Sequence, residues 1–122
     1  MKPDRIRPAD VGAWGEEEAC RYLKRQGYEI VMRNYRCGIG EIDIIARKDK
    51  ILHFLEVKTR RGLAYGLPAE AVDRRKKAHI TGCVKHYMVS NIIIDKDFQI
   101  DVIEILCSEG RAYLRHTENA FA

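Results

Sequence analysis

The sequence predicts an α/β protein in which helices cover a mixed β-sheet. Two observations predict this class. A helical stretch near the start is followed by three strand-like segments, a second helical stretch and at least one further strand. In addition, the strand-like segments 41–46 and 51–60 are apolar on both faces, which is typical of central strands with a helix on each side.

The first helix is expected to run from Asp10, as its N-terminal cap, to about Gln26, and Gly27 is expected to end it. Apolar side chains recur along it at helical spacing: Val11, Trp14, Ala19, Tyr22 and Leu23. Three strands are then expected at 28–36, 41–46 and 51–60. Gly38, Gly40 and the charged turn 47–50 separate them, so they are expected to form a meander.

A second helix is expected to begin at Pro68 and to end near Met88, because an apolar side recurs within a very basic segment. The pattern is also compatible with a break in the middle of this helix. Further strands are expected at 91–94 and 98–106, around the turn 95–97, with a short last strand at 112–115.

The length of 122 residues and the hydrophobic content of 46% predict a single domain over residues 1–122. The longest apolar stretch is too short to span a bilayer, and the charges and prolines near the start are atypical of a signal peptide. We therefore expect a cytoplasmic protein without a membrane segment. The cysteines at 20, 37, 83 and 107 form no CxxC pair, so no zinc site is expected and the thiols are interpreted as buried or incidental.

Positive charge is concentrated in one segment of the chain. The chain contains 22 Lys and Arg residues against 18 Asp and Glu residues. Residues 56–85 contain 8 basic and 3 acidic residues, so the whole surplus lies there. Such a run is more often a solvated helix face than a binding surface. Its closeness in sequence to the charged strand residues described next nevertheless favours phosphate contacts.

Three charged residues interrupt the apolar strands: Asp43, Glu56 and Lys58. Glu56 and Lys58 are two residues apart, so they project to the same face of a strand. If a tight turn at 48–49 joins the two strands, residue 46 pairs with residue 51 and Asp43 lies opposite Phe54. Asp43 is then diagonal to Glu56 on one face, at roughly 7 to 8 Å, within reach of a shared ion.

Glu16 is a fourth member of this set, because it projects from the middle of the apolar stripe of the first helix. Buried carboxylates are expected to be paired, protonated or bound to a cation. Carboxylates are preferred ligands of Mg²⁺, and a lysine beside them can orient or deprotonate an attacking water. The set is therefore a candidate phosphodiesterase centre. The alternatives are an ion-pair ladder on the sheet and, for Glu16, an interaction with the helix dipole.

Several motifs are spread over nearly the whole chain: Gly15-Glu16 with Ala19, Arg33-Asn34-Tyr35-Arg36, Gly40-Glu41-Ile42-Asp43, Glu56-Val57-Lys58-Thr59-Arg60, then Gly66, Pro68, Lys76, Asp101 and Asn119-Ala120-Phe121. With them the chain resembles the PD-(D/E)xK, or restriction-endonuclease-like, nucleases. It resembles more closely the YraN-type family of small bacterial proteins of unestablished function. Two positions depart from these patterns. Gln99 stands where the YraN-type pattern often has Arg, and Ile42 stands where the wider motif has its proline.

The resemblance implies a restriction-endonuclease-like fold with an αβββαβ core. It implies Asp43 and Glu56 as ligands of Mg²⁺ or Mn²⁺, Lys58 as the catalytic lysine, and Glu16 as an accessory acid. Accessory acids of this type occur in archaeal Holliday-junction resolvases, which act as dimers on branched DNA, so a homodimer is compatible with the resemblance.

The leading hypothesis from the sequence is a metal-dependent endonuclease acting on DNA, including branched DNA. Phosphate contacts are expected from the basic residues near the candidate site: Arg60, Arg61, Arg75, Lys76 and Lys77. The alternatives are a non-catalytic nucleic-acid-binding module that retains the fold, and a scaffold in which the charged set is structural. The histidines at 53, 79, 86 and 116 have no acid partner at a telling spacing, so surface or packing roles are expected.

Overall fold

The computed structural model describes residues 6–61 and 74–121. Its regular elements, in chain order, are η2 (Pro8–Asp10), α1 (Val11–Arg25), β1 (Glu29–Cys37), β2 (Gly40–Lys48), β3 (Ile51–Arg61), α2 (Arg74–Ser90), β4 (Phe98–Ser108) and β5 (Arg111–Thr117). The order of one helix, three strands, a helix and a strand is the predicted αβββαβ core, to which β5 adds a final strand.

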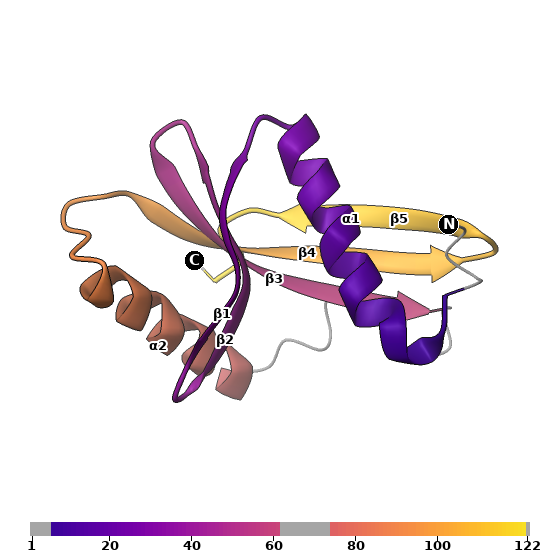
Figure 1. Ribbon diagram of the computed structural model, residues 1–122, viewed down its shortest axis with the longest axis horizontal. Helices are drawn as coiled ribbons and strands as arrows, with labels where there is room; N and C mark the ends of the chain where they lie inside the picture. The colour runs from indigo at the N-terminus through magenta and orange to yellow at the C-terminus, as the bar shows by residue number, and fades with distance from the viewer. Residues whose placement is uncertain (1–5, 62–73, 122) are drawn as a thin grey trace.

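The strands form one five-stranded mixed sheet in the order β1-β2-β3-β4-β5 (Figure 1). Neighbouring strands are antiparallel except β3 and β4, which are parallel. The segment between β3 and β4 contains α2, as expected for a crossover between parallel strands. The structure therefore confirms the predicted α/β class with a mixed sheet, and it is consistent with a restriction-endonuclease-like core.

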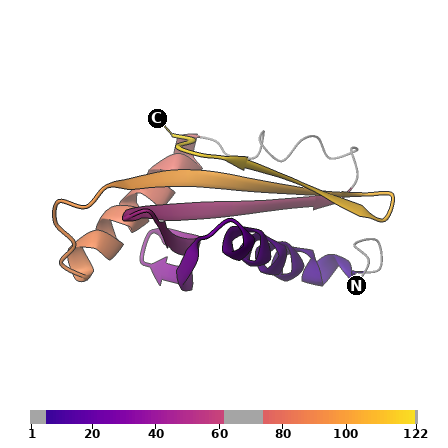
Figure 2. The ribbon, with the colours of Figure 1, turned by 90° about the horizontal axis from the view of Figure 1, so that it is seen from above.

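Helix α1 covers one face of the sheet. Ala19, Cys20 and Leu23 of α1 are almost completely buried and pack in a cluster with Ile44, Leu55 and other strand residues. Figure 2 shows α1 on one side of the long strands β3 and β4. Burial of this apolar stripe supplies most of the free energy that holds α1 on the sheet.

Helix α2 packs on the opposite face, where it forms a second cluster. Ile80, Cys83 and Val84 of α2 contact strand residues that include Phe54 and Ile45. Phe54 and Ile45 alternate along their strands with Leu55 and Ile44 of the first cluster, as expected for strands covered on both sides. Among the described residues, no helix is long and apolar enough to cross a bilayer.

The ends of α1 agree with the prediction, although the expected N-terminal cap does not form. Asp10 occupies the N-cap position, but its side chain makes no capping hydrogen bond and instead accepts one from Arg7 Nε at 2.8 Å. Gly27 follows the helix with φ +90°, and Tyr28 N donates to Leu23 O at 2.9 Å. This six-to-one hydrogen bond around a left-handed glycine is the Schellman ending of a helix.

The prediction of a strand at 91–94 is wrong. Asn91 and Ile92 form a turn that ends α2, and Ile93 N donates to Met88 O at 2.9 Å. The side chain of Asn91 also donates to Tyr87 O at 2.9 Å. The apolar run suggested a strand, but hydrogen bonding to the last carbonyls of the helix determines the local structure.

The second helix is continuous over Arg74–Ser90, so the structure shows no break there. Its expected start at Pro68 lies outside the described residues. The last two strands, Phe98–Ser108 and Arg111–Thr117, are longer than expected because a tight turn at Glu109 and Gly110, both with positive φ, joins them directly.

The expected pairing between β2 and β3 is wrong by two residues. Ala46 pairs with His53, and Lys48 pairs with Ile51. The reason is that the turn consists of Asp49 and Lys50, both with positive φ, so each strand continues up to this two-residue turn. A shift of two residues keeps the side chains of the regular pairs, 44–48 with 51–55, on their expected faces, and it moves Asp43 along the strand toward Glu56.

Candidate functional site

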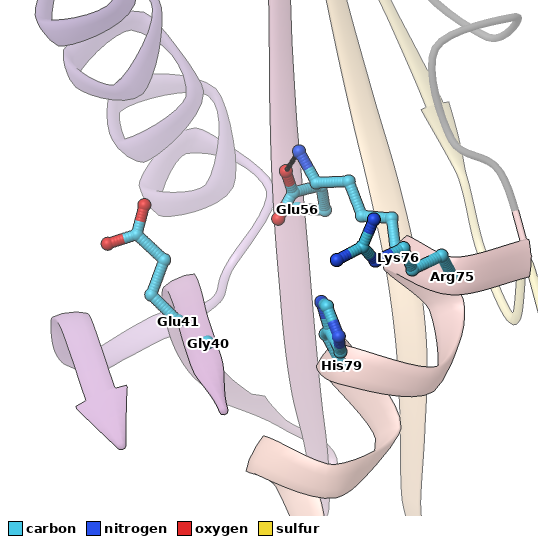
Figure 3. Close-up of a pocket in the computed structure, with 6 residues that line it drawn as sticks. All are labelled: Gly40, Glu41, Glu56, Arg75, Lys76 and His79. Atoms are coloured by element: carbon cyan, nitrogen blue, oxygen red, sulfur yellow. Dashed lines mark ion pairs between the residues drawn. The ribbon is translucent and has the colours of Figure 1, made fainter. Parts of the chain in front are cut away.

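A pocket of about 380 Å³ lies where β2, β3 and the first turns of α2 meet (Figure 3). It is lined by Gly40, Glu41, Glu56, Arg75, Lys76 and His79. In Figure 3, the basic side chains come from α2 and face Glu56 on β3, while Glu41 comes from β2. A concave site in which acidic and basic groups converge is suited to a charged ligand.

Glu56 lies at the centre of the charged groups. Its side chain is only 6% exposed, and its Oε1 atom lies 2.9 Å from Lys58 Nζ and 2.9 Å from Lys76 Nζ. Lys58 reaches it from the same strand face, two residues along β3, and Lys76 reaches it from α2. Two ammonium groups therefore offset the charge of one buried carboxylate.

Asp43 lies beside Glu56, just beyond the last regular pair of β2 and β3, Ile44 with Leu55. Ile42 packs with the α2 cluster although Ile44 packs with the α1 cluster, so the side-chain alternation of β2 is interrupted at Asp43. The Oδ2 atom of Asp43 accepts a hydrogen bond from Val57 N at 2.7 Å. The irregularity therefore brings this carboxyl group onto the backbone of β3.

Burial raises the pKa of Asp43 to about 8, and the negative charges of Glu56 and Glu16 act in the same direction. The hydrogen bond from Val57 N opposes the shift but does not cancel it. Near neutral pH, Asp43 therefore keeps a proton that can lie in its hydrogen bond with Glu56. A cation between the two carboxyl groups would favour the ionised form of Asp43.

Glu16 contributes to the same region from α1. The helix can approach β3 closely because a Cβ atom at Gly15 would lie 1.9 Å from Thr59 Oγ1. Glu16 is half-buried, and around the helix it lies between Leu23 and Cys20, within the arc of buried residues, as the sequence predicted. Its charge affects the pKa of Asp43, so it acts electrostatically on the site.

The pKa of Lys58 lies below its ordinary value, mainly because of burial and then because of the neighbouring Lys76. The hydrogen bond and charge of Glu56 oppose this shift. The lowered pKa makes Lys58 a candidate for exchanging a proton with a bound water.

Of the basic residues expected to contact phosphates, the structure places some at the pocket and others away from it. Arg75 and Lys76 line the pocket. Arg60 lies farther along β3 and donates to Thr59 O at 3.2 Å. Lys77 lies away from the pocket lining, with its ammonium group 5.3 Å from the centre of the Phe121 ring. The side chain of Arg61 lies outside the described residues.

The donor set at the site fits a hard divalent cation. Asp43 and Glu56 could hold Mg²⁺ or Mn²⁺, since Mg²⁺ is typically bound by one or two carboxylates and completed by water and substrate phosphates. The observation that supports this fit is that two buried carboxyl groups lie side by side, since a cation between them would favour the ionised form of both.

A second group of titratable residues lies on the α1 face. Asp101 is fully buried, and its Oδ2 atom accepts hydrogen bonds from His53 Nδ1 and His116 Nε2, each at 2.8 Å. Its Oδ1 atom accepts from Gln99 Nε2 at 2.9 Å and Asn119 N at 3.0 Å. Burial alone would raise the pKa of Asp101, but these four hydrogen bonds together lower it.

His53, Asp101 and Glu118 could also hold a metal ion, since their ligand atoms lie within 4.8 Å of one another. Each oxygen of Asp101 already accepts two hydrogen bonds, however, so a metal ion would have to displace existing donors. We therefore interpret this group as structural, holding β3, β4 and the C-terminal turn together.

The sequence analysis did not identify Glu41 and His79, which line the pocket. It named Lys76 as a phosphate contact but did not predict its ion pair with Glu56. The spacing of Arg75, Lys76 and His79, which places them on one side of a helix, was an available signal. No local signal pairs His53 with Asp101, because 48 residues separate them.

The fold and the site together define an α/β protein with a charged pocket between a mixed sheet and its crossover helix. Residues 15–105 match the family described as "Uncharacterised protein family UPF0102". The chain belongs to this family, which confirms the predicted YraN-type membership.

Relatives in this family match most of the chain. A UPF0102 protein of Clostridium acetobutylicum is 46% identical over 113 residues, which cover 91% of this chain and 93% of the relative. A UPF0102 protein of Clostridium botulinum is 45% identical over 115 residues, with coverage of 92% and 94%. A UPF0102 protein of Syntrophomonas wolfei is 38% identical over 112 residues, with coverage of 92% and 97%. None of these descriptions assigns an activity.

Proposed function

We propose that this protein is a metal-dependent nuclease that hydrolyses phosphodiester bonds in DNA, including branched DNA. The observation that carries the proposal is the contact between the buried carboxyl groups of Asp43 and Glu56, with Lys58 paired to Glu56 at 2.9 Å. The pocket beside them has further cations on α2, which suits a polyanionic substrate.

The residues of the site divide the work of hydrolysis. Arg75 and Lys76 hold the substrate phosphate at the mouth of the pocket and offset its charge. Asp43 and Glu56 would hold a Mg²⁺ or Mn²⁺ ion, which would supply positive charge to stabilise the reacting phosphate. Glu56 orients Lys58 through their contact at 2.9 Å; once Lys58 has released its own proton to solvent, which its lowered pKa favours, it would accept a proton from the attacking water.

A cleavage panel tests this proposal. Purified protein is incubated with a four-way junction, single-stranded DNA and duplex DNA, each with Mg²⁺, with Mn²⁺ and with a chelator. We expect Asp43→Asn to lower the cleavage rate by about 1000-fold and Lys58→Met to lower it by about 100-fold.

Two variants serve as matched controls for this panel. Glu17→Gln changes an exposed acid on α1, and Lys85→Ala changes an exposed lysine on α2. Both are expected to keep the wild-type rate. Failure of the wild-type protein to cut any of these substrates with either metal would refute the nuclease proposal.

A second candidate function is a non-catalytic nucleic-acid-binding module. The observation that favours it is the pairing of Glu56 with two lysines, which balances this carboxylate without a metal ion. DNA binding that weakens with salt and is unchanged in Asp43→Asn, without cleavage, would select this function. A scaffold role remains if the protein does not bind DNA even at low salt.

The nuclease proposal includes two expectations about the working form, namely a cytoplasmic protein and a homodimer on branched DNA. The mass of the complex with a four-way junction, measured by light scattering, distinguishes one copy of the chain from two.

A further inference from the structure

The turn between β1 and β2 rests on α2, next to the pocket. A Cβ atom at Gly82 of α2 would lie 2.2 Å from Ile39 Cδ1, so the absence of a side chain at Gly82 admits Ile39. A Cβ atom at Gly40 would lie 3.5 Å from His79 Cβ and 3.6 Å from Cys83 Sγ. The hairpin end, residues 37–40, is therefore packed directly against one side of α2.

Two cysteines meet at this contact. Cys37 ends β1 and is partly exposed, whereas Cys83 of α2 is completely buried. Their Sγ atoms lie 2.7 Å apart. A disulfide bond is roughly 2.05 Å long, so a small movement of either side chain would allow the bond. The other two cysteines, Cys20 and Cys107, belong to the cluster on the α1 face.

The two thiols differ in reactivity. The hydrogen bond with Cys83 lowers the pKa of Cys37, and the backbone N–H groups of Ile39 and Gly40 lower it further. Burial, and then the contact with Cys37, raises the pKa of Cys83 to about 12. Cys37 is therefore the more exposed thiol and the one that ionises more readily, and Cys83 is a protonated thiol held against it.

We propose that Cys37 and Cys83 form a reversible disulfide, with a peroxide as the oxidant, that joins the β1–β2 turn covalently to α2. The Cys37 thiolate attacks one peroxide oxygen and the O–O bond breaks, which gives a sulfenic acid and hydroxide. The Cys83 sulfur then attacks the Cys37 sulfur, the S–O bond breaks, and water leaves with the Cys83 proton. The two thiols lose two electrons in total, and the peroxide gains them.

The disulfide would fix one wall of the pocket. Gly40 and Glu41 of β2 follow Cys37 closely, and Arg75, Lys76 and His79 precede Cys83 on α2. A covalent bond between the two elements restricts their separation, so oxidation would limit the entry of a bulky ligand. The formation of the bond does not depend on the proposed nuclease activity.

The test is a thiol count on the full chain. Reduced protein is treated with a small excess of hydrogen peroxide, denatured, alkylated with iodoacetamide and analysed by mass spectrometry. We expect two of the 4 thiols to be lost, a linked peptide pair containing Cys37 and Cys83, and recovery of all four thiols with a dithiol reductant.

Three variants make the result specific. Cys37→Ser should abolish the linked peptide, and Cys83→Ala should leave a sulfenic acid at Cys37 that dimedone captures. The double variant Cys20→Ala/Cys107→Ala is the matched control and should still form the bond. Four free thiols after peroxide treatment, or a bond between any other pair of cysteines, would overturn the proposal.

Discussion

Asp43 and Asp101 are both buried acids on the same sheet, but their surroundings differ. Asp101, on the α1 face, receives four hydrogen bonds, and these lower its pKa despite full burial. Asp43 receives one from Val57 N and lies beside a second carboxyl group, and its pKa rises to about 8. The comparison shows that burial alone does not distinguish a structural acid from a candidate ligand. The supply of hydrogen-bond donors does.

The largest expected effect on stability comes from a substitution of Asp101, the acid with the structural role. Asp101→Asn replaces one acceptor oxygen with an amide donor, which must then face N–H donors in a buried site. We expect the free energy of unfolding to fall by about 3 kcal/mol. Urea unfolding at pH 7 measures it, with Glu17→Gln as the exposed control. A loss as small as that of the control would contradict the structural interpretation of Asp101.

The next effect concerns divalent cations. Mn²⁺ at about 100 times its dissociation constant should stabilise a protein that binds it only when folded by about 2.7 kcal/mol. We expect this stabilisation in the wild-type protein and its loss in Asp43→Asn. Thermal unfolding with and without Mn²⁺ measures it, and Glu17→Gln should respond as the wild type does. Equal stabilisation of Asp43→Asn would mean that the ion binds elsewhere.

Without divalent cations, Asp43→Asn is expected to have the opposite effect to Asp101→Asn. At pH 7 the wild-type chain must keep Asp43 protonated in the folded state although it is ionised in the unfolded state, and this lowers stability. A neutral amide avoids this cost, so we expect a gain of about 1 kcal/mol. Urea unfolding in the presence of a chelator measures whether the free energy of unfolding rises or falls in Asp43→Asn. A loss of stability would show that the buried carboxyl group is structurally satisfied.

The smallest expected effect is the pH dependence of the contribution that Asp101 makes to the free energy of unfolding. Because the folded-state pKa of Asp101 is lowered, its stabilising effect is complete above the ordinary pKa of 3.8 and is lost as the pH falls through the folded-state pKa. The difference in stability between the wild type and Asp101→Asn should therefore narrow from pH 5 to pH 3. Unfolding curves at both pH values test this, and a constant difference would exclude an ionised Asp101 as its origin.

Local patterns in the sequence were sufficient to predict most of the helices and strands. The apolar spacing before Gly27 predicted α1, and the doubly apolar segments predicted β2 and β3 within two residues at each end. The strand expected at 91–94 failed because hydrogen bonds to the end of α2 determine that segment, and an apolar run does not reveal them.

The sequence by itself determined that Glu56 and Lys58 share a strand face, because side chains alternate along any strand. It also placed Asp43 near them, although with the wrong register. Only the tertiary structure brought Lys76 onto Glu56, set two histidines against Asp101 and placed the thiol of Cys37 beside that of Cys83. These contacts link residues on different elements, so they depend on how the strands pair and how the helices pack on the sheet, which the spacing within a segment does not encode.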